Sequence, residues 1–182
     1  NFMSGILVGD SYLCTISRNR NTACLKIENN VNKEYMKWKI NKLKQFFRFK
    51  EAINGQKIRY ESEFTYEFNK IKNSLLRRDP LYFLNNYSDI GFALWIMDDG
   101  TFCRNRYTLS IGRLHNNIDM LDKIISIFAR MGLPCNYYKK QGTIRFETSC
   151  TKPIADIICW YVPPCMQYKL PERYRGFEAW IP

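Results

Sequence analysis

Two short apolar segments of this chain each end in an aspartate. The first runs from Met3 to Asp10 and the second from Phe92 to Asp99. Each is long enough for one buried helix and too short to cross a membrane. A carboxylate at the C-terminal end of a helix faces the negative end of the helix dipole, so it lowers stability unless a cation or a chemical role offsets it. The repetition of this arrangement predicts a functional site.

If the two helices pair, their aspartates come together. Side by side, the carboxylates of Asp10 and Asp99 repel each other unless a divalent cation lies between them. Oxygen ligands of this kind suit Mg²⁺, which also accepts phosphate oxygens. Gly5 and Gly9 share one face of the first helix and allow a close approach, with Ala93 as the nearest small residue of the second helix. The alternative is that each aspartate is only a solvated helix end.

The composition favours a single intracellular domain that binds a polyanion. The chain has 182 residues, 46% of them apolar, and a net charge of +11. This charge points to nucleic acid, because no amphipathic anchor or lipidation signal favours a membrane. Seven cysteines without a C-x-x-C pair and a single histidine argue against zinc and against a disulfide framework.

The source and the start of the chain have weaker signals. Asn, Lys, Ile, Tyr and Phe are abundant, which is typical of an AT-rich genome such as that of a mitochondrion or another organelle. The chain begins at Asn1 rather than methionine, which is compatible with a leader segment that was removed or left out.

The chain runs through one order of elements twice. Alternating apolar and polar residues predict strands, and apolar residues three or four apart predict helices. After the helix that ends at Asp10, the first half is expected to contain a strand at 22–28, a helix after Asn32, a strand at 57–61 and a helix at 68–76. The second half is expected to contain a helix at 88–99, a strand at 107–112, a helix after Asn117, strands at 135–139 and 143–148, and a helix from Thr151.

Two longer helices have the clearest apolar stripes. On the first, the residues expected to face inward are Met36, Ile40, Leu43 and Phe47, with Lys37, Lys39, Lys42 and Lys44 on the solvated side. On the second, they are Ile118, Leu121, Ile125 and Phe128. The spacing between these helices is close to the spacing between the aspartates. We therefore predict an α+β fold of two half-domains, 1–79 and 80–182, that form one compact unit about a pseudo-twofold axis.

The aspartate segments resemble the motif of the LAGLIDADG homing endonuclease family, in its single-chain form with two motifs. Residues 3–11 fit the nine-residue signature, with Gly5 in its third place and Asp10 in the acidic eighth place. Asp99 and Gly100 fit the last two places of the second copy.

One branch of that family is especially similar. Residues 93–100 resemble its second motif, which ends in Met-Asp-Asp-Gly, and the segment around Lys169 resembles one that carries a basic active-site residue. Three features depart from the pattern. Ser11 replaces the last glycine of the first motif, and Val8 replaces its earlier acidic residue, which is not the metal ligand. Arg77 and Arg78 stand where the branch has a lysine. Arginine keeps the charge but cannot readily exchange a proton, so only electrostatic help is expected there.

The resemblance implies αββαββα half-domains whose antiparallel sheets form a DNA-binding saddle. It also implies a nuclease that cuts both DNA strands at a specific site with metal-activated water. The residues implied for catalysis are Asp10, Asp99 and Lys169. The residues implied for metal binding are Asp10 and Asp99, with Gly9 and Asp98 beside them. Asp98 is expected to cap its helix or to support the metal ligands. The expected cofactor is Mg²⁺, with Mn²⁺ or Ca²⁺ able to replace it in binding. Two motifs in one chain imply a monomer.

Charged residues on the solvent side of the strands offer donors and acceptors for the DNA grooves. The predicted DNA-binding residues are Lys26, Glu28, Lys57, Arg59, Arg145 and Glu147, together with Arg78 and with Arg113, which is expected near the DNA backbone or metal-bound water. Glu61 shares this face. The alternative is an ordinary charged sheet surface.

Two other functions fit the same pattern. The first is an RNA-binding intron maturase, a splicing factor in which the basic surface binds intron RNA without cutting DNA. The second is a DNA-binding module that has lost cleavage. The retained aspartates argue against that module, because a pure binder gains nothing from negative charge near phosphates.

Overall fold

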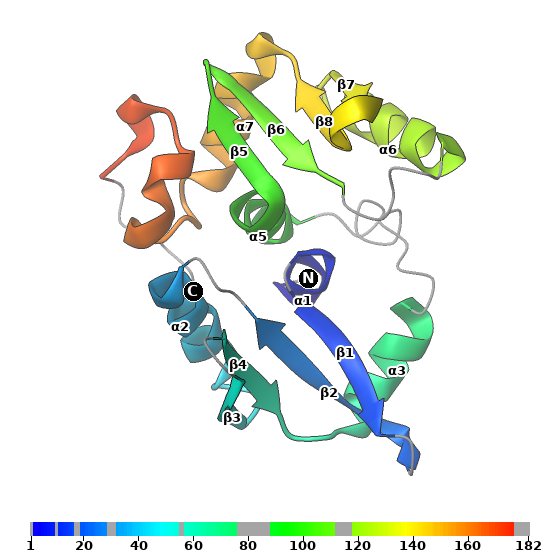
Figure 1. The fold of residues 1–182 in the computed structure, drawn as a ribbon. Helices are drawn as coiled ribbons and strands as arrows, with labels where there is room; N and C mark the ends of the chain where they lie inside the picture. The colour runs from blue at the N-terminus through cyan, green and yellow to red at the C-terminus, as the bar shows by residue number, and fades with distance from the viewer. Residues whose placement is uncertain are drawn as a thin grey trace. The chain divides into compact units, whose positions relative to one another are not determined.

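The structure is a computed structural model, and it describes residues 2–9, 11–16, 19–28, 32–54, 57–75, 88–111 and 118–176 (Figure 1). The chain divides into two compact units. The large unit consists of Asn1–Gly9 and Pro80–Pro182, and the small unit of Asp10–Asp79. Helix α1, Phe2–Val8, therefore belongs with the second part of the chain although it comes first in the sequence.

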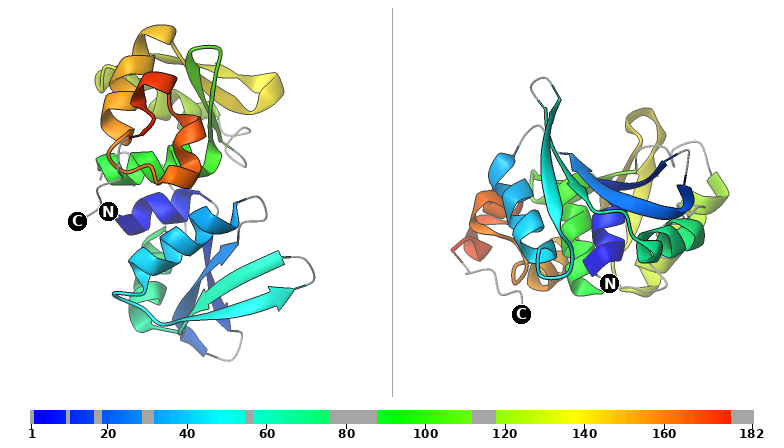
Figure 2. Two further views of the ribbon diagram at one scale, coloured as in Figure 1. Left: turned by 90° about the vertical axis from the view of Figure 1, so that its left-hand side faces the viewer. Right: turned by 90° about the horizontal axis from the view of Figure 1, so that it is seen from below.

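The small unit contains a four-stranded antiparallel sheet and two described helices. Its elements are β1 (Ser11–Ile16), β2 (Asn19–Glu28), α2 (Lys33–Leu43), β3 (Phe49–Asn54), β4 (Lys57–Ser62) and α3 (Tyr66–Leu75). The strand order is β1-β2-β4-β3. Both helices lie on one side of this sheet (Figure 2). Leu25 and Ile27 of β2 are fully buried, so the residues that alternate with them lie on the other face.

The large unit repeats this order of strands and helices. Its elements after α1 are α5 (Asp89–Asp99), β5 (Gly100–Cys103), β6 (Arg106–Ser110), α6 (Ile118–Arg130), β7 (Cys135–Tyr138), β8 (Thr143–Phe146) and α7 (Thr151–Ile158), with 3₁₀ helices η2 (Lys139–Gln141), η3 (Thr148–Cys150), η4 (Pro164–Lys169) and η5 (Glu172–Tyr174). The strand order β5-β6-β8-β7 corresponds to that of the small unit. The predicted α+β class with antiparallel sheets is confirmed, whereas the half-domain boundaries and the pseudo-twofold axis remain predictions.

The predicted helix starts at Asn32 and Ser88 are confirmed. The Asn32 side chain accepts a hydrogen bond from the Tyr35 N–H at 2.9 Å, and the Ser88 hydroxyl accepts one from the Gly91 N–H at 3.2 Å. Each bond satisfies an N–H group that the first turn of a helix leaves without a partner. The third predicted cap, Asn117, lies outside the described residues.

The apolar stripe of α2 is confirmed within the helix. Met36, Ile40 and Leu43 are buried. Phe47 lies beyond the last residue of α2 and contacts Phe68 of α3, with ring centroids 4.5 Å apart. The stripe therefore continues into the loop and joins the two helices.

The prediction that Lys39 lies on the solvated side of α2 is wrong. Its side chain is buried, with the ammonium 4.5 Å from the centre of the Tyr35 ring. A lysine can bury its apolar stem and hold its charge over an aromatic ring. Helical periodicity assigns every lysine to the solvated side and so misses this case. Lys37 and Lys44 are exposed, as predicted, and Lys42 is half-buried.

The apolar stripe of α6 is partly wrong. Leu121 and Phe128 are buried as predicted, but Ile118 is 60% exposed. Ile124 is fully buried, whereas Ile125 is only half-buried. The buried face therefore follows a spacing of three and then four residues from Leu121. Ile118 is the first residue of the helix and precedes this face.

Strand β8 is shorter than the sequence predicts. It ends at Phe146, because the Cys150 N–H bonds back to the Glu147 carbonyl oxygen at 3.0 Å and closes η3 instead of extending the strand to Thr148. Strands β1, β3 and β5 have no counterpart among the ranges expected from the sequence. Helix α7 begins at Thr151, as predicted. None of the described helices has the length and apolar character needed to cross a membrane.

An aromatic cluster joins α5, α6 and β8. Phe92 of α5 lies 5.9 Å from Phe128 of α6 and 6.4 Å from Phe146 of β8, measured between ring centroids. Trp95 of α5 lies 6.2 Å from Phe128. All four side chains are buried, and rings at these separations attract one another beyond their burial of apolar surface. The cluster fixes α5, and with it the aspartates at its end, in the large unit.

Phe128→Ala should lower the free energy of unfolding by about 3–5 kcal/mol, because it opens a cavity in this cluster. Ile118→Ala, on the same helix, should change it by less than about 0.5 kcal/mol, since its side chain is exposed. Urea unfolding followed by circular dichroism measures both. Equal losses would mean that both side chains lie in the core.

Candidate active site

Helices α1 and α5 approach each other closely at a pair of glycines. A Cβ atom built on Gly5 would lie 2.6 Å from both the Cα and the carbonyl oxygen of Gly91, and real Cβ contacts are essentially never shorter than 3.0 Å. Gly5 therefore has no room for a side chain while the two backbones stay in place. The predicted close approach through Gly5 is confirmed.

The residue opposite Gly5 differs from the prediction. It is Gly91 and not Ala93. Two residues along a helix point in directions about 200° apart, so Ala93 lies on the other side of α5, where it is fully buried.

The Asp98 side chain occupies the space that a side chain of Gly9 would need. A Cβ atom on Gly9 would lie 2.6 Å from the Cβ of Asp98 and closer still to its carboxylate. Asp98 is half-buried at this point. Its carboxylate therefore lies against the backbone at the end of α1, and its predicted role beside the metal ligands remains a prediction.

Helix α5 continues its apolar surface into its last turn. Every residue from Gly91 to Met97 is buried, and Asp98 and Asp99 are half-buried. The helix stops at Gly100, whose N–H bonds to the Ile96 carbonyl oxygen, and its last turn contains no basic residue. The aspartates and the terminal carbonyl groups thus place negative charge at one helix end.

Lys169 brings a positive charge to this end from a distant part of the chain. Its Nζ atom donates to the carbonyl oxygen of Ile96 at 3.3 Å and to that of Met97. Lys169 ends η4, which is held by the buried side chains of Met166 and Leu170. A cation in this position offsets the negative end of the helix dipole. The structure therefore places this predicted site residue against the end of α5.

The oxygen atoms at these helix ends suit a hard divalent cation. Carboxylates and backbone carbonyl groups are ligands for Mg²⁺, Mn²⁺ or Ca²⁺ rather than for zinc. Among the described residues, no three Asp, Glu, His or Cys side chains gather around one point. Asp10 lies outside the described residues. Its role as a metal ligand therefore remains a prediction.

The predicted DNA-binding residues of the small unit lie on the sheet face opposite α2 and α3. Lys26 of β2 pairs in register with Glu61 of β4, and Glu28 pairs with Arg59. Ile27, between the two β2 residues, is buried. The predicted alternation of charged and buried residues on these strands is therefore confirmed, while DNA binding itself remains a prediction.

These four charged side chains are bonded to one another. Lys26 Nζ lies 2.9 Å from Glu61 Oε1, Arg59 Nη1 lies 3.4 Å from the same oxygen, and Arg59 Nε donates to Glu28. The Tyr12 hydroxyl donates to Glu28 at 3.1 Å. The hydrogen bond from Lys26 lowers the pKa of the Glu61 carboxyl group, and the same bond raises the pKa of Lys26. Both groups are therefore held in their charged forms.

The predicted residues of the large unit have different partners. The Arg145 guanidinium lies 4.0 Å from the centre of the Tyr138 ring and donates to the side chain of Gln141. Glu147 is exposed beyond the end of β8 and accepts a hydrogen bond from the Ser149 hydroxyl at 3.5 Å. Arg145 is thus positioned by a ring and an amide.

The remaining predicted residues lie at edges or outside the described chain. Lys57 is the first residue of β4 and lies opposite Asn54 of β3. Arg78 and Arg113 lie outside the described residues. The sequence pattern did not indicate Gly91 or Tyr12. Gly91 could have been found as a second glycine near the start of a motif helix. Tyr12 could have been found as a hydroxyl on the strand that neighbours the strand of Lys26.

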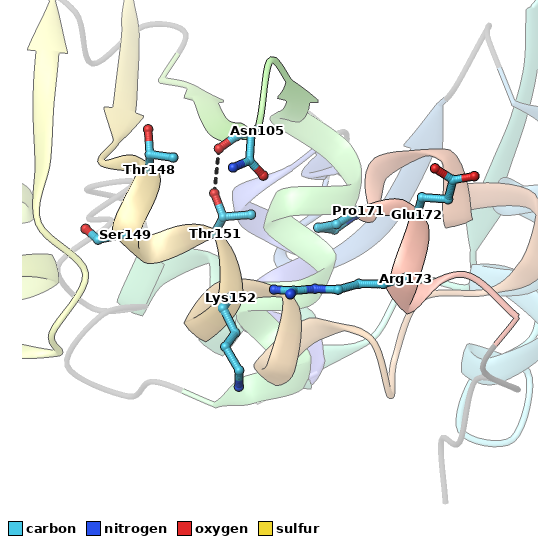
Figure 3. Close-up of a pocket in the computed structure, with 8 residues that line it drawn as sticks. All are labelled: Asn105, Thr148, Ser149, Thr151, Lys152, Pro171, Glu172 and Arg173. Carbon is cyan, nitrogen blue, oxygen red and sulfur yellow. Dashed lines mark hydrogen bonds between the residues drawn. The ribbon is translucent and has the colours of Figure 1, made fainter.

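A hollow of about 600 Å³ lies elsewhere in the large unit (Figure 3). Its lining residues are Asn105, Thr148, Ser149, Thr151, Lys152, Pro171, Glu172 and Arg173. In Figure 3 the Arg173 side chain reaches toward the start of α7, and the Thr151 hydroxyl bonds to the Asn105 carbonyl oxygen at 2.7 Å. None of the predicted site residues lines this hollow, so it is distinct from the candidate active site.

Solved structures of homing endonucleases have this fold. The homing endonuclease I-WcaI bound to its DNA recognition sequence matches with a TM-score of 0.74 and 19% sequence identity, over 93% of this chain and 84% of that chain. I-DmoI in complex with DNA and Ca matches with a TM-score of 0.56 and 12% identity, over 95% of this chain and 93% of that chain. At these identities the likeness shows the fold alone.

The sequence has a relative among known proteins and matches one family model. The protein from Mycosarcoma maydis named Probable intron-encoded DNA endonuclease 3 is 29% identical over 93 residues, which are 50% of this chain and 68% of that protein. The model of the LAGLIDADG DNA endonuclease family matches residues 1–152, which include both aspartate segments. The chain therefore belongs to the LAGLIDADG DNA endonuclease family, and the resemblance seen in its motifs is confirmed.

Lys169→Met should lower the free energy of unfolding by about 1 kcal/mol, because it removes the cation from the end of α5. Lys169→Arg keeps the charge and should lose less than half as much. Thermal unfolding followed by circular dichroism measures both. Equal losses would contradict the electrostatic role of the ammonium group.

Gly9→Ala should lower the free energy of unfolding by about 1–3 kcal/mol, because its methyl group meets the Asp98 side chain. In a background with Asp98→Gly the same change should cost far less, so the two substitutions are expected to couple. Urea unfolding of the four proteins of this double-mutant cycle gives the coupling energy. Additive effects would show that the two residues do not touch.

Proposed function

We propose that this protein is a site-specific double-strand DNA endonuclease that hydrolyses phosphodiester bonds with the help of divalent metal ions. Its family membership supports the nuclease reaction. The observation that carries the proposal is the contact between Gly9 and Asp98, which joins the ends of the two motif helices. In the sequence, the next residue after each is the acidic residue of its motif, Asp10 after Gly9 and Asp99 after Asp98.

In this proposal Asp10 and Asp99 hold the metal ions, with the Gly9 carbonyl group and the Asp98 carboxylate beside them. A bound divalent ion lowers the pKa of a water molecule and neutralises the leaving oxygen in such reactions. I-DmoI has been solved in complex with DNA and Mn and in complex with DNA and Ca, which supports divalent metal use in this fold. Mg²⁺ is the metal that we expect to act here.

Lys169 is the proposed basic residue of the site. Its ammonium group is held against the last carbonyl groups of α5 by η4. A cation fixed in advance stabilises the extra negative charge that a phosphate gains during hydrolysis, without rearranging at the moment of reaction. A purely structural role follows from the same contacts. Cleavage assays on Lys169→Met at temperatures where it is folded distinguish the two, because a purely structural role leaves cleavage by the folded variant unchanged.

The proposed substrate is double-stranded DNA. The net charge of +11 supports binding to a phosphate backbone, and the charged strand faces supply base-reading groups. A maturase role is not favoured, because the relative is named as a DNA endonuclease and the solved relatives are homing endonucleases. The relative is named as intron-encoded, and the abundance of Asn, Lys, Ile, Tyr and Phe is typical of an AT-rich genome, so we propose an organellar intron as the source. The two motifs in one chain support a monomer.

Asp10→Asn and Asp99→Asn should each slow DNA cleavage by about 100-fold or more, because each removes a charged metal ligand. DNA binding should persist. The assay uses a duplex recovered from a randomised DNA library by cleavage with the unaltered protein and Mg²⁺. Asp119→Asn, an exposed acid on α6, is the matched control and should cleave normally. Cleavage that survives in Asp99→Asn, or in excess EDTA, would refute the proposal.

A further inference from the structure

Five side chains on the sheet face opposite α2 and α3 form one connected network. Glu61 accepts from both Lys26 and Arg59, and Glu28 accepts from both Arg59 and Tyr12. Arg59 is therefore the link between the two carboxylates. The connections run across strands β1, β2 and β4, so the network spans most of the width of the sheet.

The charges of this network cancel. It contains two cations and two carboxylates within a chain whose net charge is +11. The four charged side chains are only 17–31% exposed, so water and salt screen them less than ordinary surface pairs. This patch consequently offers little net attraction to a phosphate backbone, in contrast to the chain as a whole.

The bonds also fix the orientation of the Arg59 guanidinium. Its Nε donates to Glu28 and its Nη1 to Glu61. A guanidinium has five N–H donors in a rigid plane, and these two bonds use two of them. Three donors remain, and on a DNA base the best match for two parallel donors among them is the O6 and N7 edge of guanine.

We propose that Arg59 reads a guanine in the DNA target and that Glu28 and Glu61 determine specificity by acting through it. The two carboxylates hold the guanidinium in the orientation for a base edge and cancel the charge that would otherwise bind any phosphate. They are positioning residues, and Arg59 is the residue that touches DNA. This inference rests on the proposed function, because it describes how one surface of the nuclease selects its sequence.

The large unit offers a natural contrast. Arg145 is held by the Tyr138 ring and by the Gln141 side chain, neither of which has a charge to cancel its own. Arg145 is therefore suited to phosphate as well as to bases. The difference between the two arginines lies in their partners.

Glu28→Gln and Glu61→Gln test this inference, with Arg59→Gln as the third variant. Each is measured by fluorescence anisotropy with a random-sequence duplex, in EDTA so that no cleavage occurs, over a range of NaCl concentrations. Each glutamate variant should bind this duplex about three- to tenfold more tightly at low salt and with a steeper salt dependence. Glu67→Gln, the same charge change at an exposed position of α3 on the other side of the sheet, should leave binding within about twofold.

Base preference is measured by binding selection from a randomised duplex library. Arg59→Gln should lower the preference for guanine at one position by about tenfold or more, and the glutamate variants should weaken it severalfold at the same position. Circular dichroism confirms that each variant is folded.

Unchanged base preference in all three variants, or equal gains in affinity from Glu67→Gln and Glu61→Gln, would overturn the inference. If either result is found and the unaltered protein still binds and cleaves DNA, the inference about Arg59 fails while the proposed nuclease function holds. If the unaltered protein binds no duplex DNA, both proposals fail together.

Discussion

The contact between α1 and α5 is the constraint on which the candidate active site depends. Gly5 and Gly91 let the two backbones meet, and four residues later Gly9 leaves room for the Asp98 side chain. This close approach directs two helix ends that bear negative charge toward one place. Lys169 then supplies the cation that neither helix contains in its own last turn. The aromatic cluster around Phe92 keeps α5 in position for all of these contacts.

The sequence predicted those parts of the fold that depend on neighbouring residues. Side-chain caps at Asn32 and Ser88 act within one turn, so their chemistry is visible in the sequence alone. Burial depends on what packs against a helix, and here the prediction was wrong for Ile118 and for Lys39. Ile118 precedes the buried face of its helix. Lys39 is buried with its ammonium group over the Tyr35 ring, a contact that helical periodicity does not predict.

The candidate site was predictable to the level of its motif residues. Asp99 and Lys169 follow from motif likeness, and the structure adds that Lys169 binds the carbonyl groups of α5. Its partner lies more than seventy residues away in the sequence, so no local pattern could indicate it. The network around Arg59 depends on strand register, and a shift of one residue would turn every member to the other face. The alternation of apolar and polar residues predicts which sheet face a side chain lies on, but not which side chains it bonds to.

The contact between Gly9 and Asp98 also limits how this protein can be recombined. The two motif helices are not interchangeable, because one ends in a residue without a side chain and the other fills that gap with a carboxylate. A chimera that joins the first helix of this chain to the second half of a relative leaves a void wherever the relative has a smaller residue than aspartate. The reverse chimera, with alanine in place of Gly9, creates a collision. Compatible parents can therefore be chosen by inspecting this one pair of positions.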